Sequence, residues 1–388
     1  MKQYDRKNAV NFWQSLPRPF FVLAPMANVT DSVFRRMIAK YAKPDVMWTE
    51  FVSADGLISP GRKILLHDLK YSEAERPIVA QLFTGHPEAM KKAATLVADL
   101  GFDGLDINMG CPDRAVEKQG GGAGMIKNPK DAVAVIEAAR EGVRKSAKCK
   151  VQSVKLQVNQ LRYPLRQGFG GQEGFVGQEM GKINSGGIPV TVKTRLGYNQ
   201  IDWGWIRTLL EQKLPALTIH LRTRKEMSEV PAHWELMPEI VKLRDEVSPE
   251  TLIIGNGDVN NLVDAIEKTK KYDCDGVMIG RGIFGMPWLF SEIRNSKHEI
   301  RDKSKIKNPK SKTPKERLKI MVEHTKLFEK TFLPGKRNGN GIKNFAVMKK
   351  HFKAYVSGWE GAKELRVKLM RTESFKEVNK IVEDYINK

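Results

Sequence analysis

The amino-acid sequence predicts a (β/α)8 barrel followed by a small all-α helical domain. Three observations lead to this fold class. Between residues 20 and 295, eight short apolar runs recur along the chain, as expected for parallel strands that are buried on both faces. Amphipathic helical patterns separate these runs and give a repeating β-then-α order. Beyond residue 313 the strand signals stop and only helical periodicity remains.

The eight predicted strands are short runs that are apolar where they begin. In chain order they are FFVLAPM from Phe20, VMWTEFVSA from Val46, PIVAQLF from Pro77, GLDINMG from Gly104, PVTVKTRL from Pro189, ALTIHLR from Ala216, LIIGNGD from Leu252 and GVMIGRGI from Gly276. A doubly wound open sheet is the alternative. The barrel is favoured because polar residues cluster at the C-terminal ends of the runs, where (β/α)8 enzymes carry their active sites.

Helices are predicted between the strands and again in the tail. In the first, TDSVFRRMIAKY, Thr30 or Asp31 can serve as the N-cap. The next, PEAMKKAATLVADL, begins with Pro87, a residue favoured in the first turn. DAVAVIEAAREGVRK and NLVDAIEKTKKY follow the same helical period. The tail predicts helices near residues 314–330, 342–355, 361–370 and 374–386.

The predicted domain organisation is a barrel over residues 1–295, a linker over 296–313 and a helical domain over 314–388. The linker is rich in lysine and proline and poor in apolar residues, which is typical of a solvated connector. Residues 148–187 interrupt the barrel repeat with a Gly- and Gln-rich stretch whose first half is basic. A loop of this length is either an insertion without catalytic meaning or an RNA contact.

Positive charge is concentrated in the last quarter of the chain. The formal net charge is +21, and residues 297–388 hold 25 Lys and Arg against 11 Asp and Glu, a net of +14. Excess positive charge favours a polyanion through release of counterions, although a basic surface can also serve solubility alone. The uneven distribution favours a nucleic-acid partner.

Composition argues against several other classes of protein. The sequence has no run of about 18 apolar residues, so no membrane span is expected, and Met1–Gln14 lacks the apolar core of a signal peptide. Three cysteines give no disulfide framework, and no pair has the close spacing of a zinc site. We therefore expect a cytoplasmic protein with no bound metal. We also expect a monomer, although no feature of the composition decides this.

Polar or glycine-rich groups follow seven of the eight predicted strands. They are Pro25 with Met26, Gln81, Asn108 with Cys111, Lys193 with Arg195, His220 with Arg222, Asn256 with Gly257 and Asp258, and Gly280 with Arg281. Barrels often bind phosphate between the loops after strands seven and eight. The turns GNGD and GRG let backbone amides approach such a group, and Arg281 supplies a fixed positive charge. Tight turns without a ligand are the alternative.

Lys193, His220 and Cys111 indicate redox chemistry at the barrel mouth. A cation beside the pyrimidine edge of a flavin stabilises the anionic reduced form, although a structural ion pair for Lys193 and a core position for His220 are alternatives. Cys111 follows the fourth strand within NMGCP, and a thiol of pKa about 8.5 can deliver a proton to carbon near neutral pH. A small buried residue is the alternative for Cys111, and we assign that role to Cys149 and Cys274.

Motifs along most of the chain resemble one family, the FMN-dependent tRNA-dihydrouridine synthases of the bacterial type. DINMGCP followed by VTVKTRLG is the most specific pair. The matching stretches are LAPMANVTDSVFR from Leu23, AQLFTG from Ala80, DINMGCP from Asp106, KQGGGAGMIKNP from Lys118, VTVKTRLG from Val190, IHLRTR from Ile219, GNGDV from Gly255, MIGRGIFGMPWLF from Met278 and MKKHFKAYVSGWEGAKELR from Met348.

The resemblance implies an FMN-binding barrel, a helical RNA-binding domain, tRNA as substrate and NADPH as reductant. It implies that hydride passes from reduced FMN to C6 of a uridine and that Cys111 protonates C5. The uridine must reach the barrel mouth, so we expect it to be flipped out of the tRNA. By resemblance, the FMN-binding residues are Pro25, Met26, Ala27, Gln81, Lys193, His220, Asn256, Gly257, Asp258, Gly280 and Arg281.

Further residues are candidates for contact with the tRNA. Asn108, Arg195 and Arg222 are expected to orient the base. Phosphate contacts, which position RNA without reading its sequence, are expected from the basic tail. The candidates are Lys343, Lys349, Lys350, Lys353, Arg366 and Arg371. A solvated helix face is the alternative for each of them.

Two positions depart from the family pattern. Leu221 stands where the family has glycine in I-H-G-R-T-R, and its bulk could alter the flavin or uridine pocket. Asn28 replaces a common glycine.

Two rival functions stay open. A flavin barrel acting on a free small molecule is disfavoured by the basic tail, and an RNA-binding scaffold with an inactive barrel is disfavoured by the intact set of Cys111, Lys193 and Arg281.

Overall fold

A computed structural model describes residues 11–146, 187–292, 312–333 and 341–387 of the 388-residue chain. The predicted insertion over 148–187 and linker over 296–313 lie almost wholly outside the described residues, as does Cys149. The domain boundaries placed in those segments therefore stay predictions.

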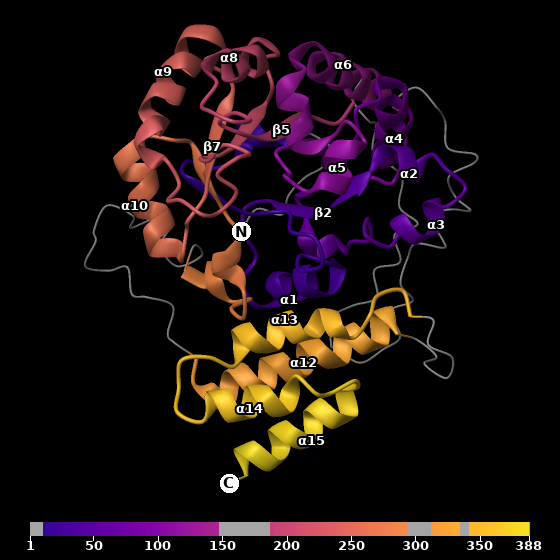
Figure 1. The fold of residues 1–388 in the computed structure, drawn as a ribbon, viewed down its shortest axis with the longest axis vertical. Helices are drawn as coiled ribbons and strands as arrows, with labels where there is room; N and C mark the ends of the chain where they lie inside the picture. Colours follow the sequence, from indigo (N-terminus) through magenta and orange to yellow (C-terminus); the bar gives the residue numbers. More distant parts are fainter. Residues whose placement is uncertain (1–10, 147–186, 293–311, 334–340, 388) are drawn as a thin grey trace.

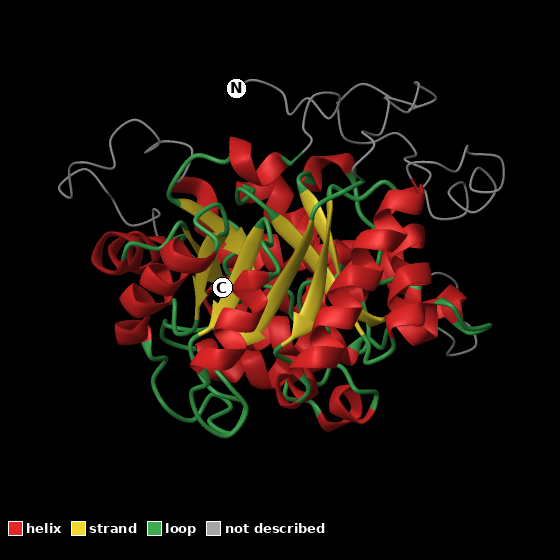
Figure 2. Cartoon of the chain, turned by 90° about the horizontal axis from the view of Figure 1, so that it is seen from above, coloured by secondary structure: helices red, strands yellow, loops and turns green. Residues whose placement is uncertain are grey.

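The described strands form one parallel sheet with the order β1-β8-β7-β6-β5-β4-β3-β2. Val22 of β1 pairs with Val46 just before β2, and the Leu23 amide donates to the Val46 carbonyl at 3.2 Å, so the sheet closes on itself. The helices surround this ring of strands (Figure 2). The (β/α)8 barrel is confirmed and the open sheet is excluded. The strands are β1 (Phe20–Leu23), β2 (Met47–Ser53), β3 (Ile78–Phe83), β4 (Gly104–Met109), β5 (Val190–Arg195), β6 (Ala216–His220), β7 (Leu252–Asn256) and β8 (Gly276–Ile279).

The helices on the outside of the barrel follow the predicted segments. The Asp31 side chain caps the first by accepting from the amides of Val33 and Phe34 at 2.9 Å each, and Pro87 begins α4 as expected. The helices are α1 (Ser32–Ala42), α2 (Ala54–Leu57), α3 (Arg62–Leu65), α4 (Pro87–Asp99), α5 (Arg114–Lys118), α6 (Pro129–Ser146), α8 (Trp203–Glu211), α9 (Met237–Val247) and α10 (Leu262–Tyr272). Short 3-10 helices are η1 (Phe12–Ser15), η2 (Glu73–Glu75), η3 (Gly122–Lys127), η4 (Trp234–Leu236), η5 (Arg281–Ile283) and η6 (Leu289–Glu292).

Aromatic side chains fill the N-terminal end of the barrel interior. Trp13 of η1 lies with its ring centroid 5.8 Å from that of Trp48 and 6.1 Å from that of Phe20. These residues belong to a buried apolar cluster with Val22, Ile254 and Met278 on neighbouring strands. The apolar filling leaves the opposite end, where the strands finish, for polar groups.

Beyond the barrel, the described residues form the helices α12 (Pro314–Phe332), α13 (Ala346–Tyr355), α14 (Ala362–Leu369) and α15 (Phe375–Ile386). They lie together on one side of the barrel, next to α1 (Figure 1). The rings of Phe34 on α1 and His324 on α12 stack with centroids 5.2 Å apart. The predicted helix over 342–355 begins later, at Ala346, because the Asn344 side chain accepts from the Ala346 amide at 2.8 Å and Lys343 turns toward the barrel.

Candidate active site

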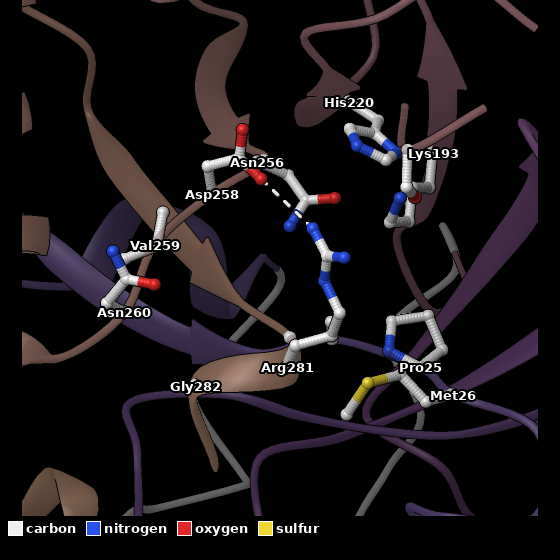
Figure 3. A pocket seen from close by; sticks show the side chains of 14 residues that line it. Pro25, Met26, Lys193, His220, Asn256, Asp258, Val259, Asn260, Arg281 and Gly282 are labelled. Atoms are coloured by element: carbon white, nitrogen blue, oxygen red, sulfur yellow. Dashed lines mark hydrogen bonds and ion pairs between the residues drawn. The ribbon is translucent and has the colours of Figure 1, made fainter. Parts of the chain in front are cut away.

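A cavity of about 360 Å³ opens at the C-terminal ends of the strands, within the size range of ligand pockets. Nine residues predicted to bind a cofactor line it, namely Pro25, Met26, Lys193, His220, Asn256, Gly257, Asp258, Gly280 and Arg281. In Figure 3, Lys193 and His220 lie on one side, Asp258 and Asn260 lie on the other, and the Arg281 side chain extends between them. Ala27 and Gln81 do not line this cavity. Ser228 does, and nothing in its surrounding sequence marked it.

The turns after β7 and β8 depend on glycine. Gly257 has φ +128°, and a Cβ there would stand 2.7 Å from that of Ala232. A Cβ on Gly282 would stand 2.7 Å from the carbonyl oxygens of both Val259 and Asn260. The turn at Gly282 can therefore approach the turn after β7, and the turn at Gly257 can approach the loop that carries Ala232, only without side chains at these positions. The result is exposed backbone beside a cation, which suits an anionic group.

Asp258 fixes the arginines around this end of the cavity. Its carboxylate accepts from Arg281 at 3.0 Å, from the Ala232 amide at 2.9 Å and from the buried Arg222. Burial raises the pKa of Asp258, but the hydrogen bonds from Arg222 and Ala232 outweigh it and leave the pKa below its ordinary value. Arg281 keeps 61% of its side chain exposed, so it can still bind a ligand.

Lys193 and His220 form the opposite wall. Burial, and then the nearby Arg195, lowers the pKa of Lys193 to about 8. Burial and the surrounding cations hold the pKa of His220 well below its ordinary value, so the ring is neutral at pH 7. Arg222 lies 3.1 Å from His220 Nε2, and a guanidinium can only donate. Nε2 is therefore the acceptor, which assigns the remaining proton to Nδ1 and makes that atom a donor.

Backbone hydrogen bonds fix the loop that carries Cys111. Asn108 Oδ1 accepts from the amides of Gly110 at 3.1 Å and Cys111 at 2.9 Å. The Ala123 amide donates to the Cys111 carbonyl at 2.9 Å, and Gly122 has φ +58° where a Cβ would stand 2.6 Å from that carbonyl oxygen. Burial raises the pKa of the Cys111 thiol. The thiol is therefore protonated at neutral pH and can act as an acid.

Asp106 is a buried site residue that was absent from the sequence-based candidates. Its carboxylate accepts from Gln81 Nε2 and from Thr191 Oγ1, each at 2.6 Å, and Gln81 in turn accepts from Asn108 at 2.9 Å. Burial raises the pKa of Asp106 to about 6. Gln81 therefore joins Asp106 and Asn108 in a buried polar network. The sequence could have indicated Asp106, because it lies two residues before Asn108 on one strand and the two side chains therefore face the same side.

The three residues predicted to orient a base hold loops together. Asn108 holds the Cys111 loop by accepting hydrogen bonds from the backbone amides of Gly110 and Cys111. Arg195 donates to the carbonyl of Gly110 at 2.8 Å and to that of Met227 at 2.9 Å. Arg222 donates to the carbonyl of Val230 at 2.6 Å. All three side chains are buried, so their contact with a base stays a prediction.

The basic tail residues fall into two groups. Lys350, Lys353 and Arg371 are exposed. The other three are partly buried and have partners within the chain: Lys349 pairs with Glu373 at 2.8 Å, Arg366 donates to the Val356 carbonyl at 2.7 Å, and Lys343 forms ion pairs with the barrel. The exposed group is therefore the better candidate for phosphate contact.

The two departures from the family pattern have distinct structural settings. Leu221 is fully buried in the main apolar core and does not line the cavity. Asn28 has φ +53°, a left-handed conformation that favours glycine and that asparagine tolerates better than most residues. Neither substitution places bulk in the cavity.

Fold and cavity together define a (β/α)8-barrel protein with an anion-suited cavity at its strand ends. A family model described as dihydrouridine synthase (Dus) matches residues 22–159 and 179–388. A probable tRNA-dihydrouridine synthase from Staphylococcus aureus strain COL is 38% identical over 97% of this chain and 95% of its own. Probable tRNA-dihydrouridine synthase 2 from Bacillus subtilis strain 168 is 38% identical over 97% of each chain. The chain belongs to the dihydrouridine synthase family and is an oxidoreductase.

Comparison with solved structures adds no further information about function. A solved structure of a morphinone reductase mutant covers 74% of this chain and 89% of its own with 12% identity and a TM-score of 0.43, too slight a likeness to bear on function. In the described part of the chain, no group of three or more His, Cys, Asp or Glu side chains could hold a metal ion. The helices described there include none long and apolar enough to cross a membrane.

Proposed function

We propose that this chain is a tRNA-dihydrouridine synthase that binds FMN in the barrel cavity and reduces the C5–C6 double bond of specific uridines in tRNA. The observation that carries this proposal is the cavity itself. It combines glycine turns and Arg281, suited to a phosphate, with Lys193 and His220, suited to a polar ring edge. Two relatives that span nearly the whole chain bear the name of this activity.

The lining residues fit FMN by their chemistry. Arg281 and the turns at Gly257 and Gly280 would hold the phosphate. Lys193 and neutral His220 would donate hydrogen bonds to the ring, and the loop at Pro25, Met26 and Ala27 would contact its apolar part. When bound, FMN supplies the hydride for C6 of the uracil, with NADPH as its reductant.

The chain supplies the proton and the environment for this reaction. Cys111 Sγ gives its proton to C5. The raised pKa of the thiol keeps it protonated at neutral pH until that step. Lys193 stabilises negative charge at the ring edge because desolvation strengthens its field. Asn108 and Arg195 hold the Cys111 loop from two sides. These residues act as one preorganised unit.

The helices α12 to α15 would bind the tRNA, and the barrel would perform the chemistry. Lys350, Lys353 and Arg371 are exposed there and can contact phosphates without reading sequence. The described residues 312–333 and 341–387 hold 16 Lys and Arg against 9 Asp and Glu, a net charge of +7, which draws RNA to this side of the molecule.

The direct test is to map dihydrouridine, position by position, in unmodified tRNA incubated with the purified protein, FMN and NADPH. We expect new dihydrouridine at one or a few positions and none without FMN. A yellow protein that oxidises NADPH but leaves tRNA unchanged would move the substrate to another RNA or to a small molecule. A protein that binds no FMN would contradict the cofactor assignment.

A further inference from the structure

A single lysine joins the tail helices to the loop that lines the cavity. Lys343 precedes α13, and its Nζ lies 2.5 Å from Glu50 Oε2 and 3.0 Å from Asp68 Oδ1 of the barrel. Glu50 Oε1 accepts from the Asn28 amide at 2.5 Å. Asn28 lies two residues after Met26, which lines the cavity together with Pro25. A continuous chain of polar contacts therefore runs from the tail helices to Asn28, next to the loop that lines the cavity.

Charge makes Lys343 necessary to this arrangement. The carboxyl groups of Asp31, Glu50 and Asp68 surround its one ammonium group. Burial raises the pKa of Glu50 to about 7, and Lys343 opposes that rise. Glu50 is only 4% exposed, so removal of Lys343 would leave a buried carboxylate without its cation. Such a group is strongly unfavourable and would take up a proton or move.

The cavity loop itself requires external support. Asn28 has φ +53°, a conformation that a non-glycine residue keeps only where its surroundings enforce it. The Thr30 hydroxyl holds one end of the loop by accepting from the Met26 amide at 2.8 Å. Glu50 holds the other end through Asn28. A change in the charge or position of Glu50 would therefore reach the residues that line the cavity.

We propose that Lys343 is a positioning residue that sets the shape of the FMN-contacting loop through Glu50, so that docking of the tail helices and binding of FMN stabilise each other. The inference rests on the proposed function only in taking FMN as the ligand of the cavity. Because coupling free energies are reciprocal, FMN should also stabilise the docked tail. Lys343 thereby has a role in the barrel instead of on the RNA-binding surface.

The test measures FMN binding to full-length apoprotein by flavin fluorescence, without turnover. We expect K343M to weaken FMN binding by about tenfold, a typical size for such coupling, and K343R to restore most of the affinity. The matched control is K40M. Lys40 of α1 pairs with Glu323 of α12 across the same boundary but stands outside the route from Lys343 through Glu50 to Asn28, so K40M should bind FMN like the wild type.

A double-variant cycle identifies the route. E50Q keeps the shape of Glu50 but removes its charge, and we expect K343M/E50Q to bind FMN no more weakly than K343M alone. Independent effects would multiply and would overturn the inference. So would wild-type affinity in folded K343M, or an equal loss in K40M. If K343M does not fold, E50Q must weaken FMN binding by itself, and wild-type affinity in E50Q would then overturn it. Wild-type protein that binds no FMN would instead contradict the proposed function.

Discussion

At the scale of single residues, the surroundings of Cys111 favour an acid over a nucleophile. Its neighbours Asn108 and Ala123 hold the backbone, and burial opposes formation of the thiolate. Lys193 and Arg195 partly offset that effect without reversing it. The sequence predicted a thiol just after the fourth strand but could not tell which protonation state the surroundings of Cys111 favour.

The proton-donor role predicts the behaviour of C111A. We expect this variant to bind FMN and tRNA normally but to lose turnover by about 10²–10⁴-fold, the usual contribution of a general acid. In the wild type, turnover should fall as pH rises through about 8, where Lys193 loses its charge, while the thiol, whose pKa is raised by burial, should still carry its proton there. Single-turnover rates across a pH series would measure both effects. C274A serves as the control, because Cys274 is buried in the core away from the cavity. Full activity in C111A would disprove the assignment.

At the scale of elements, the starts of the strands were predicted well and the start of helix α13 was not. Buried parallel strands are continuous apolar runs, so each of the eight began within a residue or so of its predicted start. The start of α13 was predicted four residues early because Lys343 and Asn344 fit a helical pattern locally. In the structure Lys343 instead pairs with Glu50, 293 residues away, and the Asn344 side chain accepts from the Ala346 amide, so the helix starts later. Local periodicity cannot show such a contact.

The turns after β7 and β8 also give an element-scale prediction. In G282A the new methyl group would stand 2.7 Å from two carbonyl oxygens, so the turns must separate. We expect a loss of stability of about 1–3 kcal/mol and weaker FMN binding, since the proposed phosphate site includes both turns. G124A is the matched control, because a methyl group there meets nothing closer than 3.7 Å. Thermal melting and FMN titration would compare the two, and equal behaviour would argue against a phosphate site at these turns.

At the scale of the whole molecule, folding separates the basic side chains that face solvent from one that faces the barrel. The sequence predicted a basic helical tail, but only the structure distinguishes Lys343, which faces the barrel, from Lys350 and Lys353, which face solvent on α13. In the sequence, all three lysines look alike, because each is a basic residue within a predicted helix. The difference arises from where Glu50 and Asp68 lie after folding.

The exposed pair predicts how tRNA binding depends on salt. Each phosphate that the protein ceases to neutralise should reduce the slope of log K against log salt by about 0.7–0.9. We therefore expect K350Q/K353Q to bind tRNA more weakly at low salt and with a shallower slope, while its FMN affinity is unchanged. The control K242Q removes one positive charge from exposed Lys242 on α9, on the far side of the barrel from α13 (Figure 1). K242Q should leave the slope unaltered, because screened charge at that distance contributes little. If both variants gave the wild-type slope, α13 would not be the phosphate-binding surface, and another basic segment of the chain would have to bind the tRNA.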